Sequence, residues 1–180
     1  MRKALYILGQ LSDADIEWML AFGERRSVPR GEVIVRENKA IEDVFLILDG
    51  SFSVTDQRLK SQELARLGSG EIVGEMSFVD SAPPSATVTA VEDGRVLAIP
   101  RQRLREKIEE DDSFAARFYR ALAIFLADRL RSTVRRLGYG EGIALDEDVI
   151  QEDELGFEVL DTVHVAGLRF KIILERLSRG

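Results

Sequence analysis

The segment from Gly74 to Val88, GEMSFVDSAPPSATV, constrains the fold of this 180-residue chain more than any other feature. A Gly-Glu pair leads into a run that can form one helical turn. Pro83 and Pro84 then force the chain to become extended, because proline fixes its own φ and disfavours helix in the residue before it. Gly74, like Gly70 before it, lets the backbone turn sharply and approach a ligand closely. The segment therefore predicts a helical turn between two strands, beside a binding site.

The residues around this segment alternate short apolar, β-branched runs with turn signals from Gly31 onward. Asp49-Gly50 and Asp93-Gly94 lie between such runs and favour hairpins, because glycine accepts a positive φ at no steric cost. The spacing predicts a mainly β fold built from short strands. The expected strands are GEVIVRE, DVFLIL, SFSVT, ELARL, GSGEIV, ATVTAV and RVLAI, with DQRLKSQ as a polar loop.

Helical patterns flank the strands on both sides. Ser12 stands before acidic residues and an apolar stripe from Ile16 to Phe22, so we expect a capped packing helix there. After Pro100, RQRLREKIEEDD predicts a short helix, and Ser113 is expected to cap a single helix of about seven turns. The apolar residues of that long helix recur every three or four positions: Phe114, Phe118, Leu122, Phe125, Leu126, Leu130, Val134 and Leu137.

The Gly74–Val88 segment and the strands around it resemble the cyclic-nucleotide-binding domain family, over about Leu11 to Leu137. The resemblance implies a double-stranded jelly-roll β-barrel with flanking helices, followed by a long C-terminal helix and an acidic tail. The implied divisions are an N-terminal helical segment at 1–30, the barrel at 31–100 with its phosphate-binding cassette at 70–88, C-terminal helices at 101–137, and an acidic linker and C-terminal appendage at 138–180.

The resemblance also implies a ligand, either cyclic AMP, cyclic GMP or a related anion. Glu75 matches the family glutamate that accepts hydrogen bonds from a ribose 2′-hydroxyl, whereas Pro84 stands where the family has the arginine that pairs with the cyclic phosphate. Losing a guanidinium contact removes roughly 1.5–3 kcal/mol per hydrogen bond. The ligand-binding residues implied by the resemblance are Gly74, Glu75, Met76, Ser77, Pro84, Ser85, Ala86 and Thr87.

Other groups in the chain could hold the phosphate without that arginine. One set is neutral: the N–H groups of a helical turn at Ser77–Asp80 and the hydroxyls of Ser85 and Thr87. The other is a cation from elsewhere in the chain, for which the candidates are Arg36, Lys39 and Arg95.

The long helix is basic, with Asp128 as its one acid. Because residues 138–157 contain seven acids and no lysine or arginine, we expect the arginines to be solvated or to pair with this tail or a symmetry mate's tail. In the family this helix pairs with its twin, so the resemblance implies a homodimer, with packing on the barrel alone as the alternative. The arginines are Arg117, Arg120, Arg129, Arg131, Arg135 and Arg136, and the implied dimer residues are Phe118, Leu122, Phe125, Leu126 and Leu130.

The last 43 residues carry ten acids and four bases, so they would repel a phosphate backbone, and we expect no direct binding to nucleic acid. The acids between Asp146 and Glu154 lack the spacing of a calcium loop, so no metal is expected. The end of the chain, EVLDTVHVAGLRFKIILERL, is interpreted as a strand and turn followed by a helix. Its apolar face would be Leu168, Ile172, and Ile173 or Leu177, and it could dock on the barrel, wrap a dimer mate or bind another protein.

Catalysis and membrane insertion find no support in the sequence. The chain has no cysteine and one histidine, His164, which is expected to be half-buried, and Ser77 lies outside a Gly-x-Ser-x-Gly motif. We expect neither an enzyme nor a cofactor. No apolar run reaches the eighteen or so residues that span a bilayer, and MRKALYILGQL does not continue as a signal peptide, so we expect a cytoplasmic protein.

We therefore expect a regulatory module that binds a cyclic nucleotide and signals through its C-terminal helix and tail, the tail being a candidate contact for a protein partner. The alternative is a degenerate domain of the same fold that serves as a constitutive protein–protein interaction scaffold with no ligand.

Overall fold

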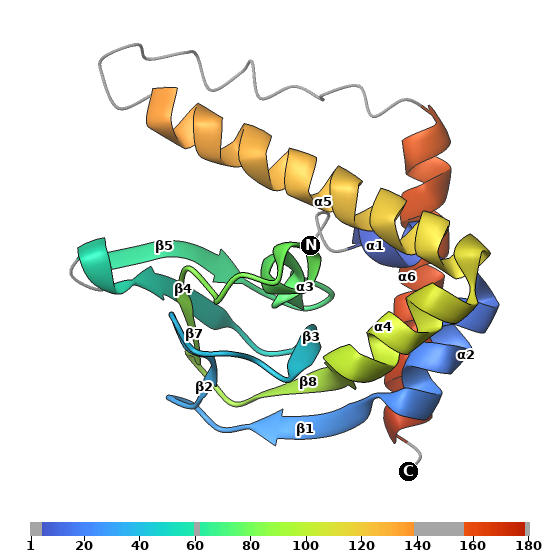
Figure 1. Cartoon of the computed structure of the whole chain (residues 1–180), viewed down its shortest axis with the longest axis horizontal. Helices are drawn as coiled ribbons and strands as arrows, with labels where there is room; N and C mark the ends of the chain where they lie inside the picture. Colours follow the sequence, from blue (N-terminus) through green and yellow to red (C-terminus); the bar gives the residue numbers. More distant parts are fainter. Residues whose placement is uncertain (1–4, 60–61, 139–156, 179–180) are drawn as a thin grey trace.

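Two four-stranded antiparallel sheets form the barrel, and helices cover one of them (Figure 1). The computed structural model describes residues 5–59, 62–138 and 157–178. The first sheet has the strand order β1-β8-β3-β6 and the second β2-β7-β4-β5. The mainly β jelly-roll predicted from the sequence is confirmed, as is the long helix that follows it.

The strands are β1 (Glu24–Val28), β2 (Val33–Val35), β3 (Asp43–Asp49), β4 (Phe52–Asp56), β5 (Gln62–Leu67), β6 (Ile72–Val73), β7 (Thr87–Ala90) and β8 (Gly94–Pro100). The helices are α1 (Leu5–Gln10), α2 (Asp13–Phe22), α3 (Glu75–Asp80), α4 (Arg101–Glu110), α5 (Asp112–Gly138) and α6 (Phe157–Ser178), with a short 3₁₀ turn η1 (Gln57–Leu59).

Strand β3 connects two apolar cores, one on each side of the first sheet. Phe45 and Ile47 point between the two sheets, where they pack with residues of β4, β7 and β8. Leu46 and Leu48 point the other way, into a core shared with the helices. Because both faces are covered, nearly the whole of DVFLILD is buried, which explains its continuous apolar run.

The two Asp-Gly turns do not form hairpins, contrary to our prediction. Asp49-Gly50 joins β3 to β4 and Asp93-Gly94 joins β7 to β8, and in each case the two strands belong to different sheets. A tight turn reverses the chain direction, but it does not make the two strands that it joins pair with each other. Here β3 pairs with β8 and β6, and β4 pairs with β7 and β5. Gly50 has φ +88°, and a Cβ on it would lie 2.7 Å from the Cα of Gly94, so the two turns pack directly on one another.

Strand β1 lies inside residues 1–30, a segment that we predicted to be helical. It pairs in register with β8, from Glu24 opposite Ala98 to Val28 opposite Gly94. Only Val28 in ERRSV is buried. The strand therefore lacks the apolar alternation that would have marked it in the sequence, and its existence depends on hydrogen bonding to a neighbour distant in the chain.

The helix starts agree with prediction in one case and differ in another. Ser12 caps α2 as expected, in a capping box in which Asp15 accepts from the Ser12 N–H at 2.7 Å. Helix α5 is a single helix as predicted, but its cap is Asp111, whose Oδ1 accepts from the N–H of Phe114 at 2.9 Å. Ser113 lies within the first turn because the acidic pair before it starts the helix earlier.

The end of the chain is one helix, α6, and the strand and turn predicted for it are wrong. Its buried face contains Ala166 and Ile173, with Phe170, Leu174 and Leu177 partly buried. Leu168 and Ile172, which we assigned to the apolar face, are 52% and 41% exposed. His164 is exposed and not half-buried. Gly167 favoured a turn, but burial of one face against the barrel's helices overrides that local preference.

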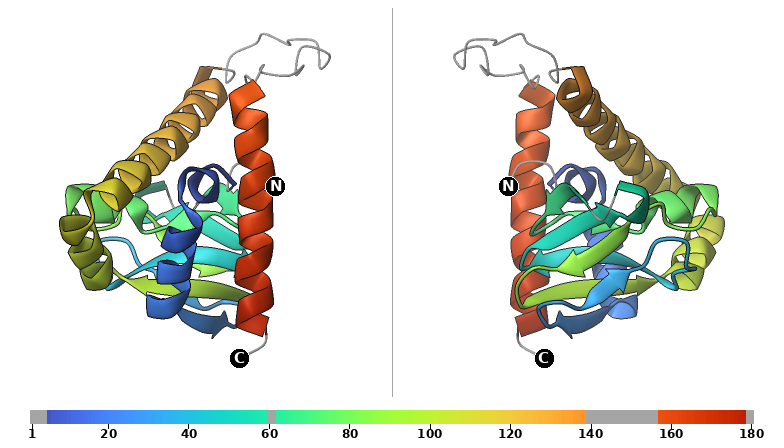
Figure 2. Two further views of the ribbon diagram at one scale, coloured as in Figure 1. Left: turned by 90° about the vertical axis from the view of Figure 1, so that its right-hand side faces the viewer. Right: turned by 90° about the vertical axis from the view of Figure 1, so that its left-hand side faces the viewer.

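Helix α6 docks on its own chain, and α1 lies between α5 and α6 (Figure 2). Of the three possibilities given for this segment, the structure has the first, docking on its own chain. Its inner face packs on α1, α2 and the outer side of the first sheet. The acidic segment before it, including Asp146 to Glu154, lies outside the described residues. Within the described part of the chain, no helix has the length and apolarity required to cross a membrane.

Three glycine-to-alanine substitutions measure how much the close contact between the two Asp-Gly turns constrains residue 50. Gly50→Ala should lower the free energy of unfolding by about 2–4 kcal/mol, because it adds a clash to a positive φ. Gly31→Ala, at φ +86° with nothing within 4 Å, should cost about 1–2 kcal/mol. Gly68→Ala has neither problem and should be neutral or slightly stabilising. Urea unfolding measures all three, and equal costs at Gly50 and Gly31 would contradict the close contact between the turns.

Candidate ligand-binding site

The cassette is built around α3, which connects β6 to β7. Gly74 is its N-cap, with φ +88°, and a Cβ there would lie 2.7 Å from Cδ1 of Ile41, so glycine is required for two reasons. The helix starts at Glu75, two residues before the predicted turn at Ser77–Asp80. This earlier start places the Glu75 carboxylate inside the protein instead of at its surface.

Glu75 forms an ion pair with Arg129 of α5. Nη1 of Arg129 donates to Oε1 of Glu75 at 2.5 Å. The Glu75 side chain is 3% exposed and that of Arg129 is 32% exposed. The guanidinium carbon of Arg129 also lies 5.5 Å from the centre of the Phe125 ring. The buried carboxylate of Glu75 and the partly exposed guanidinium of Arg129 thus lie next to each other at the start of α3.

Burial raises the pKa of the Glu75 carboxyl above its ordinary value. Arg129 and the backbone N–H groups of Glu75 and Met76 oppose this rise, because each favours the charged form. The first N–H groups of α3 therefore act on the chain's own carboxylate. We predicted the anion seat at a helical turn from Ser77 to Asp80, but the helix starts at Glu75, and a phosphate would have to share these N–H groups with the Glu75 carboxylate.

The other residues of α3 that we predicted for the site have different surroundings. Met76 is 49% exposed, and Val79 on the same helix is 48% exposed. Ser77 is buried, and its carbonyl accepts from Nη2 of Arg101 at 2.6 Å. Ser77 therefore contributes to holding the helix, whereas Met76 lies at the surface beside Glu75.

The strand side of the cassette is attached to the loop after β2. Pro84 is buried, and its carbonyl accepts from the N–H of Asn38 at 2.9 Å. Oγ1 of Thr87 accepts from the N–H of Glu37 at 3.1 Å. Ser85 is exposed and Ala86 half-buried. Of the two hydroxyls predicted to face a ligand, that of Thr87 is thus already bonded to the protein, whereas Ser85 is open to solvent.

The cation at this site is one that the sequence reasoning missed. Of the three candidates, Arg36 and Lys39 are exposed, and Arg95 pairs with Asp49 at the other end of β3. The cation that lies beside Glu75 is Arg129 of α5. Its spacing could have identified it, because Phe118, Leu122, Phe125 and Arg129 follow one another at four, three and four residues and therefore share one face of α5.

That face of α5 packs on the barrel. Phe118, Leu122 and Phe125 are buried, and the Phe118 ring meets Phe78 of α3 edge to face at 5.8 Å between centroids. Leu126 is partly buried and Leu130 is 64% exposed. The predicted dimer residues are thus divided between two faces of the helix.

Two of the α5 arginines have acidic partners in the N-terminal half of the chain. Arg117 binds Asp15 of α2 through Nε at 2.7 Å and Nη2 at 2.9 Å, and Arg129 binds Glu75. The acids of residues 138–157, with which we expected the arginines to pair, lie outside the described residues. The fold thus brings two buried acids, Asp15 and Glu75, to this basic helix.

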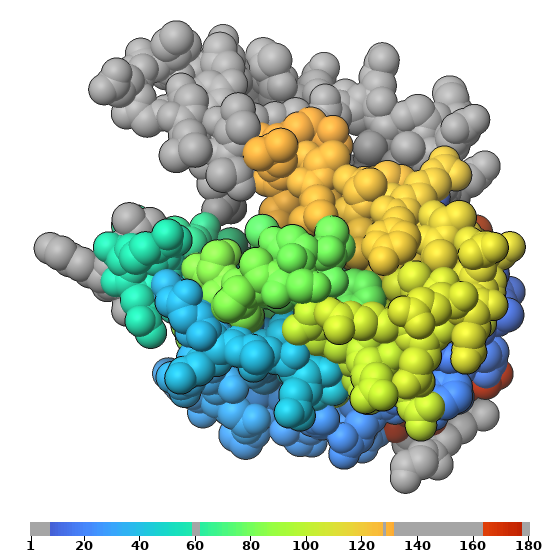
Figure 3. Space-filling model, in the orientation of Figure 1, coloured from blue at the N-terminus to red at the C-terminus, as the bar shows by residue number. Residues whose placement is uncertain are grey.

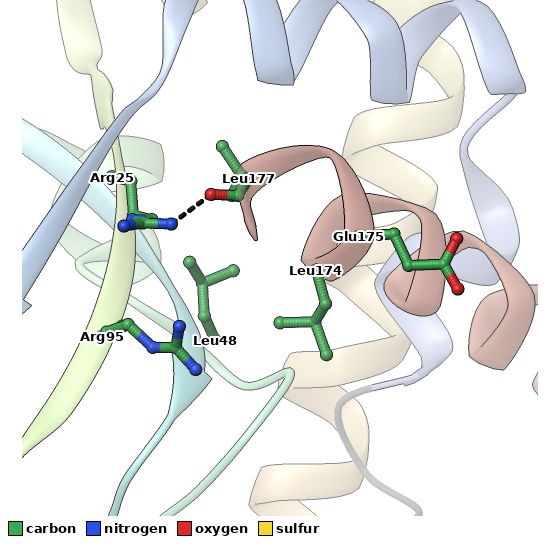
Figure 4. Close-up of a pocket in the computed structure, with 6 residues that line it drawn as sticks. All are labelled: Arg25, Leu48, Arg95, Leu174, Glu175 and Leu177. Carbon is green, nitrogen blue, oxygen red and sulfur yellow. Dashed lines mark hydrogen bonds between the residues drawn. The ribbon is translucent and has the colours of Figure 1, made fainter. Parts of the chain in front are cut away.

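A cavity of about 250 Å³ lies between α6 and the outer side of the first sheet, away from the cassette (Figure 4). Leu48, Leu174 and Leu177 line it with Arg25, Arg95 and Glu175. Arg25 donates to the carbonyl of Leu177, the last turn of α6. Both arginines have protein partners, so we interpret this cavity as a packing feature of α6. Among the described residues, no group of three or more metal-ligating side chains is present.

Comparison with known proteins supports this view of the barrel. Residues 25–111 match the family model described as the cyclic nucleotide-binding domain. A cyclic AMP receptor protein of Thermus thermophilus is 33% identical over 123 residues, which cover 67% of this chain and 55% of that protein. A CRP-like cAMP-activated global transcriptional regulator of Mycobacterium tuberculosis is 25% identical over 111 residues, or 61% of this chain and 48% of that one. The chain spans about half the length of these relatives.

Solved structures show the same fold. A cyclic nucleotide-binding domain from Methylobacillus flagellatus superposes with a TM-score of 0.69 at 23% identity, covering 79% of this chain and 85% of that one. The catabolite activator protein of Thermus thermophilus gives a TM-score of 0.62 at 23% identity, covering 97% and 87%.

Removing the cation should expose the cost of the buried acid. Arg129→Gln should lower the free energy of unfolding by about 1–3 kcal/mol at pH 7.5, less than for a fully buried pair because Arg129 is partly solvated. The pKa of Glu75 is raised by burial and should rise further without Arg129. The folded state then binds its proton more tightly than the unfolded state does, so the deficit should shrink as the pH falls toward 4.5.

Urea unfolding at the two pH values measures this, with Arg120→Gln, an exposed arginine of the same helix, as the control. A deficit that does not depend on pH would show that Arg129 stabilises the fold independently of the Glu75 charge.

Proposed function

Residues 25–111 belong to the cyclic nucleotide-binding domain family, and we propose that they bind cyclic AMP or cyclic GMP at the cassette and regulate the C-terminal helices. The chain is then a ligand-controlled module and not an enzyme, and its place is the cytoplasm. The family arginine is absent at Pro84, so the proposal depends on another source of positive charge.

The Glu75–Arg129 pair is the observation that carries the proposal. A cyclic nucleotide presents a ribose hydroxyl and a phosphate on neighbouring atoms, so it needs an acceptor and a cation close together. Glu75 is the acceptor, and Arg129, a third of which is exposed, is the cation that can turn part of its planar fork to a phosphate oxygen. Ser85, exposed at the start of the following strand, supports the phosphate as a neutral donor.

Ligand binding at this pair would act directly on α5, because Arg129 belongs to that helix. A ligand changes a conformational equilibrium only if it prefers one state, and a contact made by Arg129 supplies such a preference. The bound state would favour the position of α5 in which Arg129 reaches both Glu75 and the phosphate.

Helix α2 offers a route from α5 to α6. Its acids are divided between the two long helices: Asp15 binds Arg117 of α5, whereas Asp13 binds Arg169 and Glu17 binds Arg176 of α6. Helix α1 also contacts both (Figure 2). We infer that a shift of α5 reaches α6 through these N-terminal helices, so that α6 is the output of the module.

A homodimer through α5 would use the apolar residues of that helix that are not buried against the rest of the chain. Phe118, Leu122 and Phe125 are already buried in the chain's own core, so they cannot also form an interface. Tyr119 is 46% exposed and Leu130 64% exposed, and they share a stripe with Leu126. In Figure 3, α5 and α3 form one continuous face, so the exposed Met76 and Val79 of α3 would extend this interface.

Calorimetry with cyclic AMP and cyclic GMP tests the ligand. Pro84→Arg should strengthen binding by about tenfold or more, because it restores a guanidinium at the phosphate. Arg129→Gln should weaken it by a similar factor. Pro83→Arg adds the same charge one residue earlier, at an exposed position, and serves as the control. Hydrogen exchange of α6 amides in the same samples tests whether the ligand reaches that helix.

No heat and no thermal shift at millimolar ligand, for the wild type and for Pro84→Arg alike, would reject cyclic-nucleotide binding. That result would favour the alternative, a degenerate domain that binds protein partners constitutively.

The dimer is tested by light scattering at tens of micromolar protein. The wild type should have the mass of a dimer, and Leu130→Glu should have that of a monomer, because a buried charge in the interface costs several kcal/mol. Leu168→Glu places the same charge at an exposed leucine of α6 and should leave the dimer intact. A monomeric wild type, or a dimer that survives Leu130→Glu, would contradict the interface.

A further inference from the structure

Arg101, the first residue of α4, packs against the cassette with its guanidinium partly buried. Its Nη2 donates to the carbonyl of Ser77 at 2.6 Å and its Nη1 to the carbonyl of Ile41 at 3.0 Å. Its Nε is buried and makes no hydrogen bond to any described residue. Burial lowers the pKa of this guanidinium, with the nearby charge of Arg105 acting in the same direction and that of Asp80 opposing it. The charge is thus held by two backbone carbonyls.

Even partial burial of a charged group that has no ion pair costs free energy, which the hydrogen bonds of Arg101 to the two carbonyls offset. Helix α3 is the element that these hydrogen bonds stabilise. It spans only Glu75–Asp80, and its N-cap, Gly74, has no side chain to accept from the first N–H groups. A helix this short does not form on its own, so tertiary contacts must hold it in place.

The two carbonyls belong to two segments that meet near the start of α3. Ser77 is two residues after Glu75 on α3. Ile41 lies on the loop before β3, and a Cβ on Gly74 would lie 2.7 Å from its Cδ1. The backbone N–H of Arg101 donates to the carbonyl of Glu42 at 2.8 Å, which fixes α4 to the same loop. One side chain therefore joins the loop, the start of α3 and the start of α4.

We propose that Arg101 is the positioning residue of the cassette: by binding Ser77 and Ile41 together, it sets where Glu75 stands and ties the cassette to the helix that leads into α5. Arg101 does not contact the ligand in this proposal. Its effect on ligand affinity rests on the proposed function, whereas its effect on the position of α3 does not.

Two variants separate the fork of donors from the charge. Arg101→Met keeps an apolar stem and removes every donor, so the amides of residues 74–82 should exchange with solvent about tenfold faster or more in the absence of ligand. Arg101→Lys keeps the charge but can reach one carbonyl at a time, so its exchange should be intermediate. Arg103→Gln, on the exposed side of α4, is the control and should leave exchange unchanged.

Hydrogen exchange of the ligand-free protein, resolved by residue, gives the decisive measurement. Faster exchange confined to 74–82, with β3 and β8 unaffected, would support the proposal, and so would partial rescue by lysine. Exchange that rises equally in β3 and β8, or that does not change at 74–82, would overturn it. Titration with cyclic AMP and cyclic GMP is then added: Arg101→Met should weaken binding by about tenfold. If the wild type binds neither nucleotide, the proposed function fails, but the exchange result still decides the role of Arg101.

Discussion

The contact of α5 with the cassette helix is the interaction on which the rest of this structure depends. It has an apolar part, Phe118 against Phe78, and a charged part, Arg129 against Glu75. The apolar part gives most of the stabilisation, because aromatic rings bury large areas and pair at favourable angles. The charged part cannot be left incomplete, because Glu75 is almost wholly buried and its charge would have no partner. Packing and ion pairing thus require the same position of α5.

This contact continues through the N-terminal helices to the end of the chain. Phe118 stacks on Phe114, whose ring meets Trp18 of α2 at 5.6 Å. Helix α2 is in turn held by arginines of both α5 and α6. The short helices before the barrel therefore do not merely cover its apolar face. They connect α6 to α5, and through α5 to the cassette. A regulatory module requires such a continuous set of contacts between its ligand site and its output.

The cassette has the glutamate of the family motif, Glu75, but the arginine beside it, Arg129, comes from α5. Pro84 removes the guanidinium that the family motif carries on the strand, and the structure has a different guanidinium on α5. A cation on the strand belongs to the barrel and would bind a phosphate wherever α5 stands. A cation on α5 binds only when the helix is close. If Arg129 is the phosphate-binding residue, the affinity for the ligand therefore depends directly on the position of α5.

The sequence by itself determined the features that depend on neighbouring residues. The turn at Gly74, the extended chain after Pro83 and Pro84, the helix cap at Ser12 and the period of α5 are all set by local backbone and side-chain preferences, and they were predicted correctly. These preferences were sufficient to predict the family fold and to select Glu75 as a candidate site residue.

Tertiary structure alone decided what depends on distant residues. Strand β1 has a single buried residue and exists only because β8 pairs with it. The Asp-Gly turns join different sheets because the strands' partners lie elsewhere, and α6 is helical throughout because one of its faces is buried. Arg129 and Glu75 are 54 residues apart, and nothing local to either identifies the other. The spacing of α5 placed Arg129 on the buried face, but only the fold brought an acid to meet it, because charge pairing acts through space and not along the chain.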